Sequence, residues 1–144
     1  MTYLSEKGGF TLIELVLVLA LIAMAASVTM VSIGRTSQKA LIRNEASLLQ
    51  GALRRARQAS LFERIPVTFV MDSQQGAYAL LKAGGRSTMT HDIPGKLALS
   101  GSDEIVFFPK GDSTGGSITL TGPEGRSYLI EVDRVTGIAK LRRL

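Results

Sequence analysis

The sequence predicts an α+β chain, in which a long N-terminal helix, membrane-spanning in its first half, packs against a C-terminal antiparallel β-sheet or sandwich domain. Three observations predict this class. Residues 10–33 are an apolar run with one ionisable side chain, Glu14. Apolar residues then recur at helical spacings up to Ala59. After Pro66 the pattern changes to the alternation typical of strands.

The apolar run is long enough to cross a membrane. As a helix, residues 10–33 extend about 36 Å at about 1.5 Å per residue, against a hydrocarbon core about 30 Å thick. A buried core helix fits poorly, because the run has no polar face. The alternative is a cleavable secretory signal with Lys7 as its charged region and cleavage at residues 23–25. The continuation of the run to Ile33, and the early acid Glu14, argue against that alternative.

Glu14 needs an explanation of its own. A carboxylate in mid-bilayer costs about 2.5–3.5 kcal/mol on insertion scales, and such residues are usually functional. If the chain is cut after Gly9, the new amino terminus lies about 6 Å from Glu14 along a helix. A free amine is a natural partner for the acid, and two helices offset by about one turn pair more easily than one helix with itself. The alternatives are that Glu14 reaches the interface or is protonated.

The stretch KGGFTLIELVLVLALI, which begins at Lys7, resembles the class III signal of type IV pilins and type II secretion pseudopilins. The resemblance implies that a prepilin peptidase cuts between Gly9 and Phe10 and methylates the new N-terminal Phe10. It also implies that Glu14 accepts the N-terminal amine of a neighbouring subunit during filament assembly. The expected fold is therefore pilin-like.

This interpretation divides the chain into four parts: a leader peptide at 1–9, a transmembrane helix at 10–33, a periplasmic continuation of the helix at 34–65, and a β-rich globular domain at 66–144. The resemblance implies a single-pass protein of the bacterial inner membrane whose C-terminal domain lies in the periplasm. The charges that flank the span favour the opposite orientation, since one basic residue precedes it and three follow closely: Lys7, then Arg35, Lys39 and Arg43. The motif takes precedence, because the peptidase reads the leader on the cytoplasmic face.

The amphipathic segment carries the excess of positive charge. The helix is predicted from near Phe10 to about Arg64, with flexibility near Gly34. Its expected apolar stripe is Leu41, Leu48, Leu49, Ala52, Ala56 and Ala59, and its expected polar face is Arg43, Gln50, Arg54, Arg57 and Gln58. Residues 35–64 hold seven basic and two acidic residues, whereas residues 65–144 hold nine and eight. The basic face is either a solvated surface or a contact with acidic neighbours in a filament.

The remainder of the chain reads as short strands with turns between them. Seven are predicted, at residues 67–71, 78–81, 97–99, 105–108, 117–121, 128–132 and 138–141. Residues 83–96 are expected to be the longest irregular segment, either a contact surface or a disordered loop.

A second resemblance covers the C-terminal part. The stretch FFPKGDSTGGSITL, residues 107–120, together with the closing IEVDRVTGIAKLRRL, resembles the H-type minor pseudopilins of type II secretion, the GspH/FimT group. In this stretch Phe107 or Phe108 is expected to fill the core and Pro109 to end a strand. Ile118 and Leu120 are expected to face inward, after a tight reversal at the glycines Gly111, Gly115 and Gly116.

No catalytic chemistry is predicted. The absence of cysteine excludes a thiolate metal site and a cysteine nucleophile. The single histidine, His91, has Asp92 beside it but no nucleophile context, so a surface histidine is expected. Neither a phosphate loop nor an acidic metal loop is recognisable. We therefore expect no catalytic residue, no metal and no cofactor.

The expected function is that of a minor pseudopilin of a type II secretion system, a structural subunit that helps to initiate or cap the periplasmic pseudopilus. The resemblance implies as partners the other minor pseudopilins, the major pseudopilin, the prepilin peptidase and the inner membrane. The alternative is a type IV pilus minor pilin of the FimT kind with a role in DNA uptake. Its phosphate contacts would be Lys140, Arg142 and Arg143, helped by Arg126 and Arg134. The near-neutral charge balance of residues 65–144 argues against nucleic acid.

Overall fold

The computed structural model describes residues 10–144, and of residues 27–37 and 124 it describes the backbone alone. The chain forms two units, Met1–Ser37 and Gln38–Leu144. One helix, α1 (Leu12–Glu63), contributes residues to both. This agrees with the helix predicted from near Phe10 to about Arg64, whereas the flexibility near Gly34 stays a prediction. The helix ends ahead of Pro66, and Arg64 takes a left-handed backbone conformation with φ of 57°.

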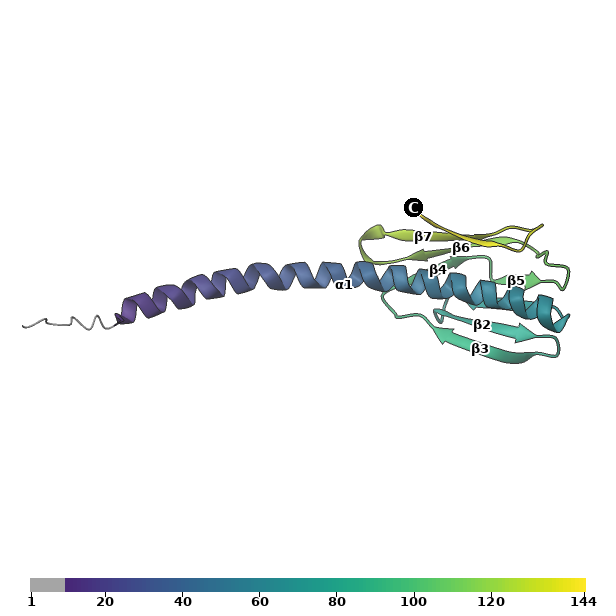
Figure 1. The fold of residues 1–144 in the computed structure, drawn as a ribbon, viewed down its shortest axis with the longest axis horizontal. Helices are drawn as coiled ribbons and strands as arrows, with labels where there is room; N and C mark the ends of the chain where they lie inside the picture. Colours follow the sequence, from purple (N-terminus) through teal and green to yellow (C-terminus); the bar gives the residue numbers. More distant parts are fainter. Residues whose placement is uncertain (1–9) are drawn as a thin grey trace, which may run out of the picture. The chain divides into compact units, whose positions relative to one another are not determined.

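Gln38–Leu144 contains two four-stranded antiparallel sheets, with strand orders β3-β2-β1-β5 and β4-β6-β7-β8 (Figure 1). A short 3-10 turn, η1 (Pro123–Gly125), separates β6 from β7. The strands are β1 (Val67–Asp72), β2 (Ala77–Lys82), β3 (Arg86–Asp92), β4 (Ala98–Gly101), β5 (Glu104–Phe107), β6 (Gly116–Thr121), β7 (Ser127–Val132) and β8 (Ala139–Arg143).

The prediction that residues 83–96 are irregular is wrong, because this segment contains β3. Residues 86–92 pair with β2, with a register shift at Leu80/Leu81. Gly84 and Gly85 have φ of 96° and 75°, as the reversal between the two strands requires. Most β3 side chains are exposed. The segment therefore lacks the apolar alternation by which a strand is recognised in a sequence.

The part of α1 that belongs to the second unit packs against both sheets. Figure 1 shows β2 and β3 along one side of it and β6 and β7 along the other. Its buried stripe recurs at spacings of four and three: Ile42, Ala46, Leu49, Leu53 and Ala56. Leu48 was predicted to belong to this stripe but is 43% exposed. Each residue turns a helix by about 100°, so a stripe that includes Leu49 directs Leu48 outward.

The predictions for residues 107–120 are confirmed. Phe107, Ile118 and Leu120 are fully buried. The strand β5 ends at Phe107, before Pro109, and the glycines at 111, 115 and 116 all have positive φ. Gly101 is under the strongest constraint, because a Cβ there would lie 2.2 Å from the carbonyl oxygen of Ser117.

Candidate functional site

Phe10 and Glu14 lie four residues apart on either side of the start of α1. Phe10 is 81% exposed and precedes the helix, which begins at Leu12. The backbone N–H of Glu14 donates to the carbonyl oxygen of Thr11 at 3.1 Å and lies 3.4 Å from its hydroxyl oxygen. Gly9, the residue that precedes the predicted cleavage point, lies outside the described residues.

Thr11 and Glu14 also form a local start signal that the sequence interpretation missed. The series Thr11-Leu12-Ile13-Glu14 matches the S/T-x-x-E pattern of a capping box. An acidic residue in the first turn is further favoured by the helix dipole. Glu14 therefore has a local role at the start of the helix as well as the assembly role predicted from the sequence, and any experiment on it must separate the two.

The side chains in the first part of α1, up to residue 26, are not buried against the rest of this chain. Every side chain from residue 10 to residue 26 is exposed. In the part of the chain that the structure describes with side chains, no helix meets the length and apolarity needed to cross a membrane. The predicted span, residues 10–33, extends beyond that part, because residues 27–33 lie outside it.

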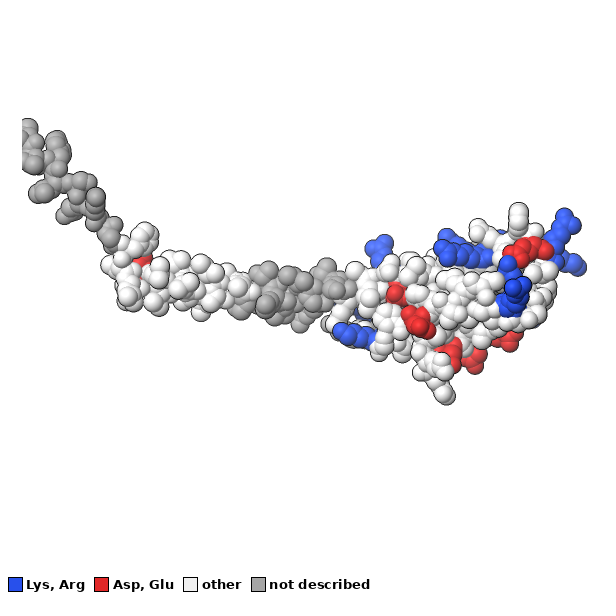
Figure 2. Space-filling view, turned by 90° about the horizontal axis from the view of Figure 1, so that it is seen from below, with Lys and Arg blue, Asp and Glu red and all other residues white. Residues whose placement is uncertain are grey.

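The three C-terminal cations of the alternative function lie on β8, an edge strand paired with β7. Arg142 is 3.4 Å from the carboxylate of Glu131, and Lys140 is the register partner of that same residue. Figure 2 shows the charges of this unit unevenly spread, with most acidic side chains toward the lower border and most basic ones toward the upper and right borders. Arg142 is thus partly neutralised and is a weaker phosphate ligand than its position in the sequence suggests.

His91 joins α1 to β3. Its Nε2 lies 2.9 Å from Oε2 of Glu45, whose side chain is 8% exposed. The imidazole, 29% exposed, also packs on the ring of Tyr78 at 5.1 Å between centroids. The histidine predicted to lie at the surface is thus partly exposed, and its ring also contacts Glu45 of α1 and Tyr78 of β2. The signal that was missed is Glu45 itself, an acid on the apolar side of the helix.

Burial raises the pKa of Tyr78 to about 12, with a further contribution from the charge of Glu45. The Tyr78 hydroxyl is buried and has no hydrogen-bond partner among the described residues. No group of three metal-binding side chains occurs in the described part of the chain. The Glu45–His91–Tyr78 cluster therefore links secondary-structure elements, and nothing in its geometry indicates a reaction.

The turn between β7 and β8 is ordered by Asp133. Its carboxylate accepts hydrogen bonds from the backbone N–H and the hydroxyl of Thr136, both at 2.8 Å, and from the N–H of Val135 at 3.1 Å. The Thr136 backbone hydrogen bond is the main reason why the pKa of Asp133 is lowered. This network fixes the backbone that lies beside Arg57 of α1.

Comparison with known families gives two matches. The family described as Type II transport protein GspH matches residues 45–136. The Prokaryotic N-terminal methylation motif matches residues 4–30. Type II secretion system protein H of Xanthomonas campestris pv. campestris is 29% identical over 143 residues, which covers 92% of this chain and 81% of that protein.

Two solved structures share the fold. The minor pseudopilin EpsH from the Type 2 Secretion System of Vibrio cholerae superposes with a TM-score of 0.60 at 11% identity, covering 72% of this chain and 96% of that chain. The type IV minor pilin FimU of Pseudomonas aeruginosa superposes with a TM-score of 0.59 at 14% identity, covering 69% and 91%. These likenesses confirm the pilin-like α+β fold, which secretion and pilus proteins share.

Proposed function

Because this chain belongs to the Type II transport protein GspH family, it is a minor pseudopilin of a type II secretion system, and we propose that it helps to initiate or cap the periplasmic pseudopilus. The family is one of structural subunits, so the proposed role is mechanical. The filament supplies the force that moves folded proteins out of the periplasm, and this chain contributes surface and anchorage.

The processing step of the proposal is cleavage between Gly9 and Phe10, followed by methylation of the Phe10 amine. The observation that carries the proposal is the methylation motif at residues 4–30, which includes Gly9 and Phe10 and continues into the first part of α1, where the side chains described up to residue 26 are all exposed. Phe10 itself precedes the helix, so its backbone is not held in the hydrogen-bonded ladder of α1. A backbone outside the helix at this point suits a peptidase.

In the assembled filament, the carboxylate of Glu14 pairs with the new amine of a neighbouring subunit. Both charged groups lose their hydration in lipid, which is unfavourable for an unpaired charge. When the carboxylate and the amine pair, each neutralises the charge of the other and lowers this cost. The pairing also fixes the axial offset between two helices at about one turn, about 5.4 Å. Glu14 thereby has two roles in the proposal: its pairing lowers the cost of a charge in the membrane, and it sets the register between neighbouring subunits of the filament.

The proposed location follows from the same steps. Residues 10–33 hold the chain in the bacterial inner membrane as a single pass, and residues 34–144 lie in the periplasm. The prepilin peptidase is the processing partner, and the other minor pseudopilins and the major pseudopilin are the assembly partners.

The intact mass of the chain isolated from membranes of its own bacterium tests the processing step. The expected mass is that of residues 10–144 with one methyl group. Gly9→Leu should leave an uncleaved precursor and abolish export, whereas the control Gly8→Ala should be processed as the wild type. A mature chain that starts near Ala26, or unimpaired export by an uncleaved Gly9→Leu chain, would refute the proposal.

A further inference from the structure

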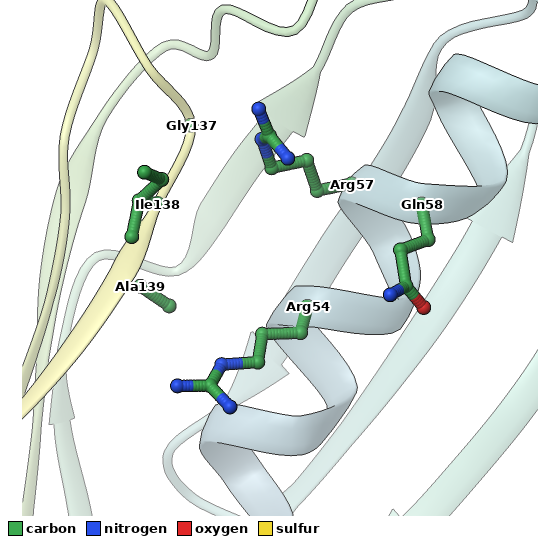
Figure 3. A pocket seen from close by; sticks show the side chains of 6 residues that line it. All are labelled: Arg54, Arg57, Gln58, Gly137, Ile138 and Ala139. Carbon is green, nitrogen blue, oxygen red and sulfur yellow. The ribbon is translucent and has the colours of Figure 1, made fainter.

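A pocket of about 310 Å³ lies between the last turns of α1 and the residues that lead from the β7–β8 turn into β8 (Figure 3). Two arginines from the helix reach toward the strand across it. Its lining contains no carboxylate: Arg54, Arg57, Gln58, Gly137, Ile138 and Ala139. A pocket with this lining favours a negatively charged group.

Arg57 is held in place by the turn. Its Nε donates to the carbonyl oxygen of Thr136 at 2.8 Å. Gly137, with φ of 63°, leaves no room for a side chain, since a Cβ there would lie 2.6 Å from the carbonyl oxygen of Gly111 and 3.2 Å from Nε of Arg57. The side chain is therefore positioned before any partner arrives, which reduces the entropy lost on binding.

Neither arginine has an acidic partner within the described part of the chain. Arg54 is exposed and makes no hydrogen bond there, and Arg57 bonds only the Thr136 carbonyl. The two acids of this helical segment are engaged elsewhere, Glu45 with His91 and Glu63 with Lys82 at 2.6 Å. Residues three apart on a helix are neighbours, so both arginine side chains extend from the same side of α1 and line the pocket with cationic donors (Figure 3).

An apolar pocket of about 520 Å³ adjoins the basic one, and Gln58 lines both. Its other lining residues are Leu61 and Phe62. Phe62 is 90% exposed although it lies in a regular helix. Arginine and aromatic residues are the types enriched in protein interfaces and in their energetic centres. This composition favours a protein partner over a solvated surface.

We propose that the eight residues that line the two pockets bind a segment of another pseudopilin that presents a carboxylate next to a large apolar side chain. We call this the α1 docking surface: Arg54, Arg57, Gln58, Leu61, Phe62, Gly137, Ile138 and Ala139. The inference rests on the proposed function, which supplies the class of partner.

Two other occupants fit less well. Proteins bind nucleic acid with rows of Lys and Arg side chains that follow its phosphate backbone, whereas half of the α1 docking surface is apolar. A symmetric contact with a second copy places the same patch against itself, which brings unneutralised arginines together. A different subunit avoids that repulsion and supplies the missing carboxylate.

The test uses the full-length chain in detergent, co-expressed with each of the other pseudopilins of its own secretion system in turn. At least one pseudopilin should be retained by the wild type, and Arg54→Glu and Phe62→Ser should each lower retention about tenfold or more. Arg86→Glu on β3 and Leu144→Ser are the matched controls, because both side chains are exposed and lie outside the surface. Both should retain the partner as the wild type does. Unchanged thermal midpoints establish that all four variants are folded.

Equal retention by the wild type and both surface variants would overturn the inference. So would a DNA duplex whose gel shift is lost in Arg54→Glu, or self-association of the chain in sedimentation that is lost in Phe62→Ser. Export separates this inference from the proposed function. If only the docking surface is wrong, Gly9→Leu abolishes export while Arg54→Glu and Phe62→Ser leave it intact. If the proposed function is wrong, export survives in all three.

Discussion

The two units of the chain differ in whether their apolar side chains are exposed or buried. From residue 10 to residue 26 every side chain is exposed, including Leu12 at 83% and Ile13 at 74%. In Gln38–Leu144 the apolar side chains form one core, and Phe69, Phe107 and Ile118 are fully buried there. The same kinds of residue are exposed throughout the described side chains of one unit and form a buried core in the other.

The difference shows where each unit finds its stability. The second unit obtains it within the chain, from a core that joins α1 to both sheets. The described side chains of the first unit are all exposed, and under the proposed function lipid and neighbouring helices surround them. Substitutions of buried core residues in the second unit should therefore change folding, and those of exposed apolar residues in the first should change assembly.

The sharpest contrast compares one large apolar side chain from each unit. Phe107→Ala should lower the free energy of unfolding by about 3–5 kcal/mol, because it opens a cavity in the core. Leu17→Ala should leave that free energy unchanged, since Leu17 is 59% exposed. Urea unfolding of the full chain in detergent, followed by the circular dichroism of its sheets, measures both. A similar decrease in the free energy of unfolding for both variants would contradict this difference between the two units.

The link between α1 and β3 offers the next largest effect. His91→Ala should lower the free energy of unfolding by about 1–3 kcal/mol, because the buried Glu45 carboxylate loses its hydrogen-bond partner. In the double variant with Glu45→Gln the loss should be smaller, since no buried charge is left. A double variant less stable than His91→Ala would show that the carboxylate does not need this partner.

The raised pKa of Tyr78 predicts a loss of stability in alkali. Below the ordinary value of 10.0 the hydroxyl is neutral in both folded and unfolded chains, so it adds no pH dependence. Between 10.0 and about 12 only the unfolded chain ionises this tyrosine, and stability therefore falls as pH rises. Tyr78→Phe should flatten this decline, and thermal midpoints measured across that range would show it. An equally steep decline in the variant would assign the effect to other groups.

Gly51 should give the smallest effect, with the opposite sign. A Cβ at Gly51 meets nothing within 4 Å, so Gly51→Ala should stabilise the chain by about 0.5–1 kcal/mol through helix propensity. Gly101→Ala is the contrasting variant and should destabilise, because its Cβ would collide with the Ser117 carbonyl. Urea unfolding distinguishes the two. Destabilisation by Gly51→Ala would mean that the glycine has a structural role within the chain.

The sequence was sufficient where one periodicity dominated. The bounds of α1, the inward direction of Ile118 and Leu120, and the end of β5 before Pro109 all follow from spacing and from proline chemistry. It was insufficient where tertiary pairing decided the structure. The strand β3 is held by its neighbour β2 and not by a buried face of its own, so no apolar pattern marks it.

The sites divide in the same way. Glu14 was found because a charge in an apolar run is conspicuous, although its position in a capping box was missed. The α1 docking surface was only partly visible, as a basic helix face containing Arg54 and Arg57. Its residues 137–139 follow a turn about eighty residues further along the chain, where the carbonyl oxygen of Thr136 accepts a hydrogen bond from Arg57. A contact over such a distance in the sequence leaves no local pattern from which it could be predicted.

The most direct test of the account replaces the charge of Glu14 and keeps its capping capacity. Glutamine serves the third position of a capping box as glutamate does, but it cannot neutralise an amine. The measurement is incorporation of the full-length Glu14→Gln chain into pseudopili in its own bacterium, beside Glu14→Leu. The account predicts that both variants are excluded from the filament and that export is lost. Incorporation of Glu14→Gln at the level of the wild type would contradict it.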